Sequence, residues 1–142
     1  MILDDMLYFV DQSPEVHRLC GGRIYVTRAP QGKPDPLVVL QRVSGDTPYA
    51  LSGEVGTTET IVSVTAYASD PNGPFKAGEL FAAIRNRISG YGGSWQRTRI
   101  DVCKQETEPL DKAEWLGDAN TMRHGVEANY LVVHAQPIPN WN

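Results

Sequence analysis

Apolar residues recur at helical spacing in two segments of the chain, and a third segment carries helix start and stop signals. Residues 2–10 place them three or four positions apart, as on one face of a short amphipathic helix. A second helix is expected over residues 14–20, where Pro14 suits the first helical position. The longest helix is predicted for residues 75–89, with Gly90 as its stop signal. The first and the longest helix should therefore each turn one apolar stripe toward the core.

Five other segments have the composition or the alternation of β-strands. They are residues 23–28, 37–43, 60–68, 97–106 and 126–136. The second is a nearly continuous apolar run and should lie well inside a sheet, whereas the third alternates cleanly. One face of the sheet should therefore meet the long helix, and the other should be partly open.

Three stretches between these elements are predicted to be irregular. The glycines at 92–93 should start a turn, and the fourteen residues 46–59 are too many for a plain hairpin. Residues 110–120 are polar, and we expect there a loop or a single helical turn that tucks Trp115 against the body of the protein.

The order α-α-β-β-β-α-β-β predicts an α+β fold, a mostly antiparallel β-sheet with helices packed on one face. A chain of 142 residues should form a single domain, residues 1–142. Its 41% hydrophobic and 21% charged residues are typical of globular proteins. The sequence contains no apolar span of 18 residues, so we expect no transmembrane segment. Asp4 and Asp5 stand where a signal peptide would carry positive charge, so we expect no signal peptide.

Charge argues against nucleic acid as a partner. The net charge is −4, and binding to phosphates requires clustered lysines and arginines. The densest basic set is best interpreted as ordinary surface cations: Arg85, Arg87, Arg97 and Arg99.

Histidines do not form a metal-binding or acid–base pattern. His17, His124 and His134 have no second ligand at the spacing that metal sites use, and we interpret them as surface or half-buried residues. His134 alternates with its apolar neighbours and is expected on the polar side of the sheet.

The two cysteines, Cys20 and Cys103, are far apart in sequence and are expected to be reduced. If Ile100 and Val102 are the inward-facing pair of their strand, Cys103 lies on the other face as a small, semi-buried side chain. It has no helix N-terminus or positioned base to activate it as a nucleophile.

The remaining candidates for chemistry are acids and glycine-rich turns. The glycine-rich stretches 51–56 and 90–93 lack the Lys-Ser/Thr of a phosphate loop. The acids are interpreted as solvated charges: Asp4, Asp5, Asp111, Glu114 and Asp118. We therefore predict no catalytic, cofactor-binding or metal-binding residue, no cofactor, and no enzymatic activity.

Residues 46–59 are the candidate functional segment. Long loops in compact domains are often functional, and this one carries apolar side chains among polar residues. We predict an assembly-interface loop built on Tyr49, Leu51, Glu54 and Val55. A flap packed locally over the sheet is the alternative.

Four segments together resemble a known family. They are residues 36–44 (PLVVLQRVS), 51–53 (LSG), 62–68 (VSVTAYA) and a helix with Ala77, Leu80, Ile84 and Arg85 that ends in Ser89 and Gly90. Residues 23–25 and 29–32 match its early pattern. The chain is similar here to the tail-completion family of tailed bacteriophages, also called tail-terminator or tail-to-head joining proteins. The resemblance runs from about residue 14 to residue 90, and residues 94–125 depart from it most.

This resemblance implies a structural virion assembly protein encoded by a phage or prophage. Such a protein would cap the tail tube at its head-proximal end and join tail to head as a ring of identical subunits, as related proteins do in hexamers. Its partners would be copies of itself, the tail tube protein and the head connector protein, with no membrane and no specific nucleic acid. It would be located in the virion tail and be assembled in the cytoplasm of the bacterial host.

Two other interpretations stay open at the level of sequence. One is a head–tail connector or minor tail protein of similar size. The other is a small ligand-binding or enzymatic α+β domain of the host, which a deep pocket around His124, His134 or Cys103 would favour.

Overall fold

The computed structural model describes residues 2–29, 34–46, 49–50, 53–54, 56–115 and 122–135. The helices in this part of the chain are α1 (Ile2–Asp11), α2 (Pro14–Cys20) and α3 (Gly73–Ile88). The strands are β1 (Ile24–Val26), β2 (Leu37–Asp46), β3 (Tyr49–Ala50), β4 (Gly53–Glu54), β5 (Thr57–Ser69), β6 (Tyr91–Trp95), β7 (Thr98–Gln105), β8 (Leu110–Trp115) and β9 (Met122–Ala135).

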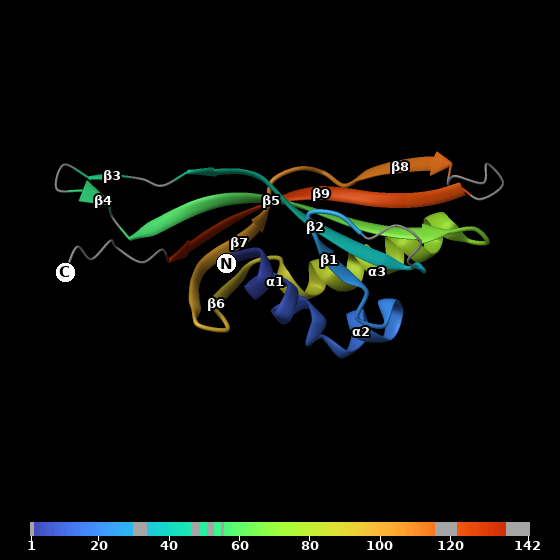
Figure 1. Cartoon of the computed structure of the whole chain (residues 1–142), viewed down its shortest axis with the longest axis horizontal. Helices are drawn as coiled ribbons and strands as arrows, with labels where there is room; N and C mark the ends of the chain where they lie inside the picture. Colours follow the sequence, from blue (N-terminus) through green and yellow to red (C-terminus); the bar gives the residue numbers. More distant parts are fainter. Residues whose placement is uncertain are drawn as a thin grey trace.

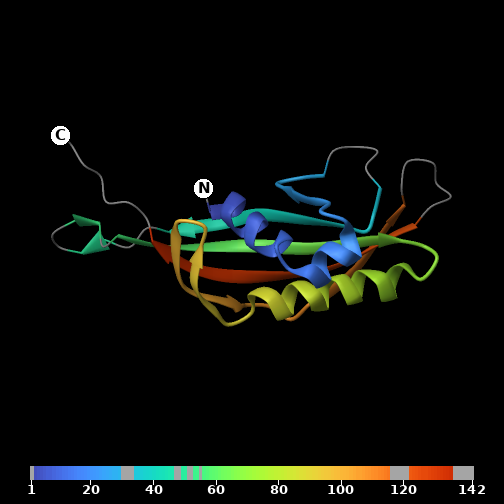
Figure 2. The same ribbon diagram turned by 90° about the horizontal axis from the view of Figure 1, so that it is seen from below.

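One large sheet organises the molecule. Its strands lie in the order β1-β2-β5-β9-β7-β6, and β8 also pairs with β9, while β3 and β4 pair with each other. Only β1 and β2 are parallel; the other described pairs are antiparallel. The three helices lie on one face of the sheet (Figures 1 and 2). The predicted α+β fold and its order of elements are confirmed, with further strands added.

The longest ladder joins β5 to β9, from Thr57 opposite Ala135 to Ser69 opposite Arg123. Alternate residues of β5 are fully buried beneath the helices, as the sequence predicts: Val62, Val64, Ala66 and Ala68. Because side chains alternate between faces along a strand, their neighbours are on the face without helices.

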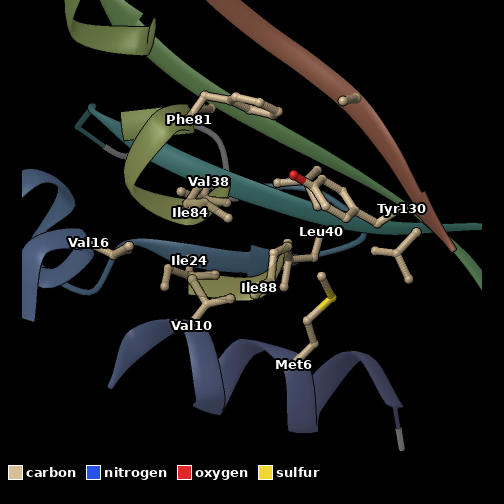
Figure 3. Packing of buried hydrophobic residues seen from close by; sticks show 14 of the residues in the cluster. Met6, Val10, Val16, Ile24, Val38, Leu40, Phe81, Ile84, Ile88 and Tyr130 are labelled. Carbon is tan, nitrogen blue, oxygen red and sulfur yellow. The ribbon is translucent and has the colours of Figure 1, made fainter. Parts of the chain in front are cut away.

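The core fills the space between the helices and this covered face. Figure 3 shows side chains of all three helices meeting the sheet. Its labelled residues, all buried, are Met6, Val10, Val16, Ile24, Val38, Leu40, Phe81, Ile84, Ile88 and Tyr130. Burial of such side chains contributes about 1.5–3 kcal/mol each and supplies most of the stability of the fold.

Local chemistry sets the ends of the helices. The Ser13 hydroxyl accepts a hydrogen bond from the Val16 backbone N–H at 3.4 Å, and Gly21 ends α2 in the left-handed conformation. Helix α3 begins at Gly73, two residues before the predicted start. A Cβ atom there would lie 2.3 Å from Cδ2 of His124, so the close approach of α3 to β9 requires glycine.

Two predictions about irregular segments are wrong. The glycines at 92–93 lie within β6, which pairs with β7, rather than starting a turn. Residues 110–115 form β8, and Trp115 is 64% exposed instead of packed against the body. Strands β6 and β8 are held mainly by main-chain hydrogen bonds, and most of their side chains are exposed. Their sequences therefore show little of the hydrophobic alternation that predicts a strand.

A β-bulge also corrects the assignment of faces in β7. The register with β9 shifts between Ile100 and Val102. The extra residue, Asp101, lets Ile100 and Cys103 both point into the core, where each is buried, while Val102 is only half-buried. The predicted inward pair, Ile100 and Val102, is therefore wrong in its second member.

Candidate assembly surface

The predicted interface loop is partly a hairpin that forms a two-stranded sheet of its own. Strands β3 and β4 pair through Tyr49 opposite Glu54, and they project beyond the helices at one end of the molecule (Figure 1). Leu51 and Val55 lie outside the described residues. The assembly role of these four residues stays a prediction.

Strands β7 and β8 follow one another along the same edge of β9. Gln105 is opposite Tyr130 and Leu110 is opposite Glu127, so the chain between them carries two more residues than β9 does. Asn129 holds this connection, because its N–H donates to the Thr107 hydroxyl at 2.9 Å and its C=O accepts from Glu106 N–H at 2.8 Å.

The two strands differ in what covers them. Strand β6 pairs with the outer edge of β7, whereas among the described residues β8 pairs with β9 alone. All six residues of β8 are exposed, including Leu110 (69%) and Trp115. An edge strand with large exposed apolar side chains is a surface suited to pairing with another chain.

A second open edge lies on the other side of the sheet. The three residues of β1 pair with Val38, Val39 and Leu40 only, so residues 41–46 of β2 pair with β5 alone among the described residues. Residues 41–44 are exposed, and Val43 is 56% exposed at a bulge in the ladder.

Charged residues flank β8 on the face without helices. Nζ of Lys112 lies 2.7 Å from Oε2 of Glu127, and Nη2 of Arg123 lies 2.5 Å from Oε1 of Glu114. The Lys112 ammonium and the Thr65 hydroxyl hydrogen-bond to Glu127 and lower its carboxyl pKa against the opposing effect of burial. These contacts fix β8 on β9 without hiding its outer edge.

Tyr67 completes this face and explains a glycine in β9. Its ring lies 4.4 Å from the Arg123 guanidinium and 5.5 Å from Nζ of Lys112, measured to the ring centroid. A Cβ atom at Gly125 would lie 3.0 Å from Cε1 of Tyr67, so the ring packs on the bare backbone there.

Histidines are placed singly, each with a local partner. Nδ1 of His17 lies 3.2 Å from Oδ1 of Asp11, and Nε2 of His124 lies 3.1 Å from Oδ1 of Asp70. His134 is buried on the helix side of the sheet, with Nε2 2.9 Å from the Thr60 hydroxyl, so its expected place on the polar side is wrong. Burial lowers the pKa of His134 and favours the neutral imidazole.

Both cysteines are free and buried. Burial raises the pKa of the Cys103 thiol to about 12, and burial is also the main cause of the raised pKa of Cys20. A thiol held protonated in the core does not serve as a nucleophile at neutral pH.

Acids and arginines singled out in the sequence are dispersed. Asp5 accepts a hydrogen bond from the Thr98 hydroxyl at 2.6 Å, and Asp118 lies outside the described residues. Arg99 pairs with Asp101, and the Arg87 guanidinium lies 3.8 Å from the centroid of the Phe9 ring. Within the described ranges, no three His, Cys, Asp or Glu side chains come together as metal ligands.

None of the helices in the described part of the chain has the length and apolar character needed to span a bilayer.

Sequence comparison assigns the family. The family model described as tail completion protein gp17 matches residues 6–134, which is most of the chain. The chain belongs to this family. Membership indicates a structural, non-enzymatic role in a bacteriophage tail. The matched residues include 94–125, which depart most from the resemblance described above.

A solved structure has a similar fold. It is a chain from the virion of a native gene transfer agent particle, with a TM-score of 0.60, 15% identity and 92% of each chain covered. Comparison with curated proteins gives no match.

The open edges were missed from sequence. The exposed edge of β8 has no periodic signal, since both of its faces meet solvent. The sequence features that could have pointed to it are the large apolar residues Leu110 and Trp115 in a mostly polar run.

Proposed function

We propose that this tail-completion protein caps the tail tube at its head-proximal end as a ring of identical subunits and joins the tail to the head. The family match over residues 6–134 carries the proposal. A hexamer is the expected ring, and the partners are the tail tube protein and the head connector protein. Assembly would take place in the cytoplasm of the bacterial host.

Two features of the molecule support an assembly role. Its open strand edges and its projecting β3–β4 hairpin are surfaces for protein contacts, and the structural likeness is to a chain of a virion particle. A closed ring needs two unlike patches on each subunit, and the sheet has different open edges on its two sides.

Deletion of the gene tests the proposal. Electron microscopy of the lysate should show abnormally long tails that lack heads, and complementation with the intact gene should restore normal particles. Tails of normal length joined to heads would refute it. Headless tails of normal length would favour a head–tail connector instead.

Shortening the hairpin tests its part in assembly. Removing residues 50–56 should leave the circular dichroism spectrum and the unfolding transition close to those of the intact protein, because β2 and β5 pair independently of β3 and β4. The same deletion should block particle formation. An unchanged particle yield would remove the hairpin from the interface.

A further inference from the structure

We infer that neighbouring subunits join edge to edge, with β8 of one copy pairing antiparallel with residues 41–46 of β2 in the next copy. The inference rests on the proposed ring and names the strands that would close it. The sheet would then continue from subunit to subunit.

The two edges match in length and accessibility. Strand β8 has six residues, and the part of β2 beyond β1 is residues 41–46. Among the described residues, neither edge has a neighbouring strand on its outer side. Unpaired main-chain N–H and C=O groups in a row are a template for another strand.

The edge of the sheet formed by β1 is protected. Strand β1 is only three residues long. Short edge strands are one way in which proteins block unwanted pairing. By contrast, the open edges expose Val43, Leu110 and Trp115, which suits surfaces that become covered.

Strand directions make the pairing antiparallel. Strand β2 is antiparallel to β5, β5 to β9, and β9 to β8. Strand β8 therefore runs opposite to β2, and a second copy placed beside the first in the same orientation presents its β2 antiparallel to β8. Antiparallel pairs are slightly more stable per residue than parallel ones.

The edges also lie at diagonal corners of the sheet. Residues 41–46 are level with residues 129–133 of β9 through β5, whereas β8 is level with residues 122–127 of β9. Joining these corners displaces each copy along the strand direction. Such a stagger is what closing a sheet into a barrel of tilted strands requires, and it suits a ring.

Charge supports a second copy as the occupant. Arg42 is on the β2 edge, and Arg28 is exposed just after β1. Glu108 and Asp111 are exposed at the β8 edge, and within the described ranges none of these four residues forms an ion pair. The β2 edge also contains Asp46, so the complementarity rests on the two arginines against the two acids of the β8 edge. Such unpaired charges of opposite sign suit a head-to-tail contact.

Cysteine cross-linking in assembled tails tests the inference. Ala113→Cys would be combined in turn with Gln41→Cys, Val43→Cys and Ser44→Cys, because adjacent strands bring opposite Cβ atoms within disulfide reach. On oxidation, at least one double variant should give a ladder of covalent oligomers in a gel run without reductant. The ladder should disappear when reductant is added. The single variants and the control pair Ala113→Cys with Tyr8→Cys should stay monomeric.

A lysine-reactive cross-linker applied to wild-type tails distinguishes a failure of the edge pairing from a failure of the proposed ring. A ladder with that reagent but with none of the three cysteine pairs would overturn edge pairing and leave the ring standing. No ladder with either would overturn the ring as well.

Charge substitutions give an independent measurement. Val43→Lys and Trp115→Lys should each reduce incorporation into tails at least tenfold, since lysine on an edge opposes pairing. Phe75→Lys, at an exposed apolar residue of α3, should incorporate normally. Equal incorporation of all three folded variants would overturn the inference.

Discussion

Strands β7 and β8 pair with the same edge of β9, but only β7 has a further strand on its outer side among the described residues. Strand β7 is covered by β6, whose Trp95 is fully buried and lies with Phe9 and Tyr91 in an aromatic cluster. Strand β8 is covered by nothing among the described residues, and its Trp115 is exposed. One segment of the edge is built into the core, and the other is left for contact.

The buried side chains of one segment should stabilise the fold, whereas the exposed side chains of the other are accessible to another protein chain. The buried side chains of the β6–β7 segment, Trp95, Ile100 and Cys103, are packed away from water. Truncating them should therefore lower the free energy of unfolding. Side chains of β8 remain in water, so their loss should matter mainly when another chain binds there.

The two tryptophans should give the largest contrast. Trp95→Ala should lower the free energy of unfolding by about 3–5 kcal/mol, because it leaves a large cavity beside α1. Trp115→Ala should change it by less than about 0.5 kcal/mol. Urea denaturation followed by circular dichroism measures both, and similar losses would show that β8 is also part of the core.

The ionised fraction of a thiol should differ by about two-thousandfold between the segments. Cys103 on β7 has a pKa of about 12, so only about one thiol in ten thousand is ionised at pH 8, whereas an exposed cysteine is ionised to about a quarter. We expect an aromatic disulfide reagent to modify Ala113→Cys within seconds to minutes and to leave Cys103 intact until unfolding. Fast modification of Cys103 in the native protein would place β7 outside the core.

Helices and strands could be predicted from the sequence where one face of the element is buried and the other is exposed. Helix α3 and strand β5 each bury one face, so their apolar residues recur with the period of the element. Strand β8 buries neither face, and its formation depends on hydrogen bonds to β9 that leave no pattern in side chains. The absence of periodicity there led to the wrong prediction of a loop or helical turn.

Faces were harder to assign than elements. Both faces of β9 carry apolar residues, so alternation alone does not tell which side the helices cover, and His134 was placed on the wrong one. In β7 the bulge at Asp101 reverses the alternation within one strand. For the interface loop, sequence identified an insertion between β2 and β5, but its pairing as β3 and β4 depends on backbone geometry.

His134, opposite Ile100 of β7, should make stability depend on pH. Burial lowers the pKa of His134 in the folded protein below the ordinary value of about 6.5. Below about pH 6.5, His134 is therefore protonated more in the unfolded chain than in the folded protein. The free energy of unfolding should therefore decrease as pH falls through this value toward the folded pKa. His134→Gln should remove that component, measured as the change in stability between pH 7.5 and 5.5.

The control for this titration is Trp115→Ala, which keeps His134 and alters only β8. It should retain the wild-type dependence on pH in this range. An unchanged dependence in His134→Gln would assign the effect to another group.

The smallest effect is expected for the ion pair that ties β8 to β9. Lys112 and Glu127 are each about a third or more exposed, so water and salt weaken their attraction, and Glu127→Gln should lower the free energy of unfolding by less than about 1 kcal/mol. The lowered pKa of Glu127 means that this stabilisation is present above the ordinary carboxyl range and is lost as pH falls through the folded pKa. Glu108→Gln, at an exposed acid without an ion pair among the described residues, is the matched control. If the difference between the two variants is not reduced by 1 M salt, the contact acts by packing and hydrogen bonding rather than by charge.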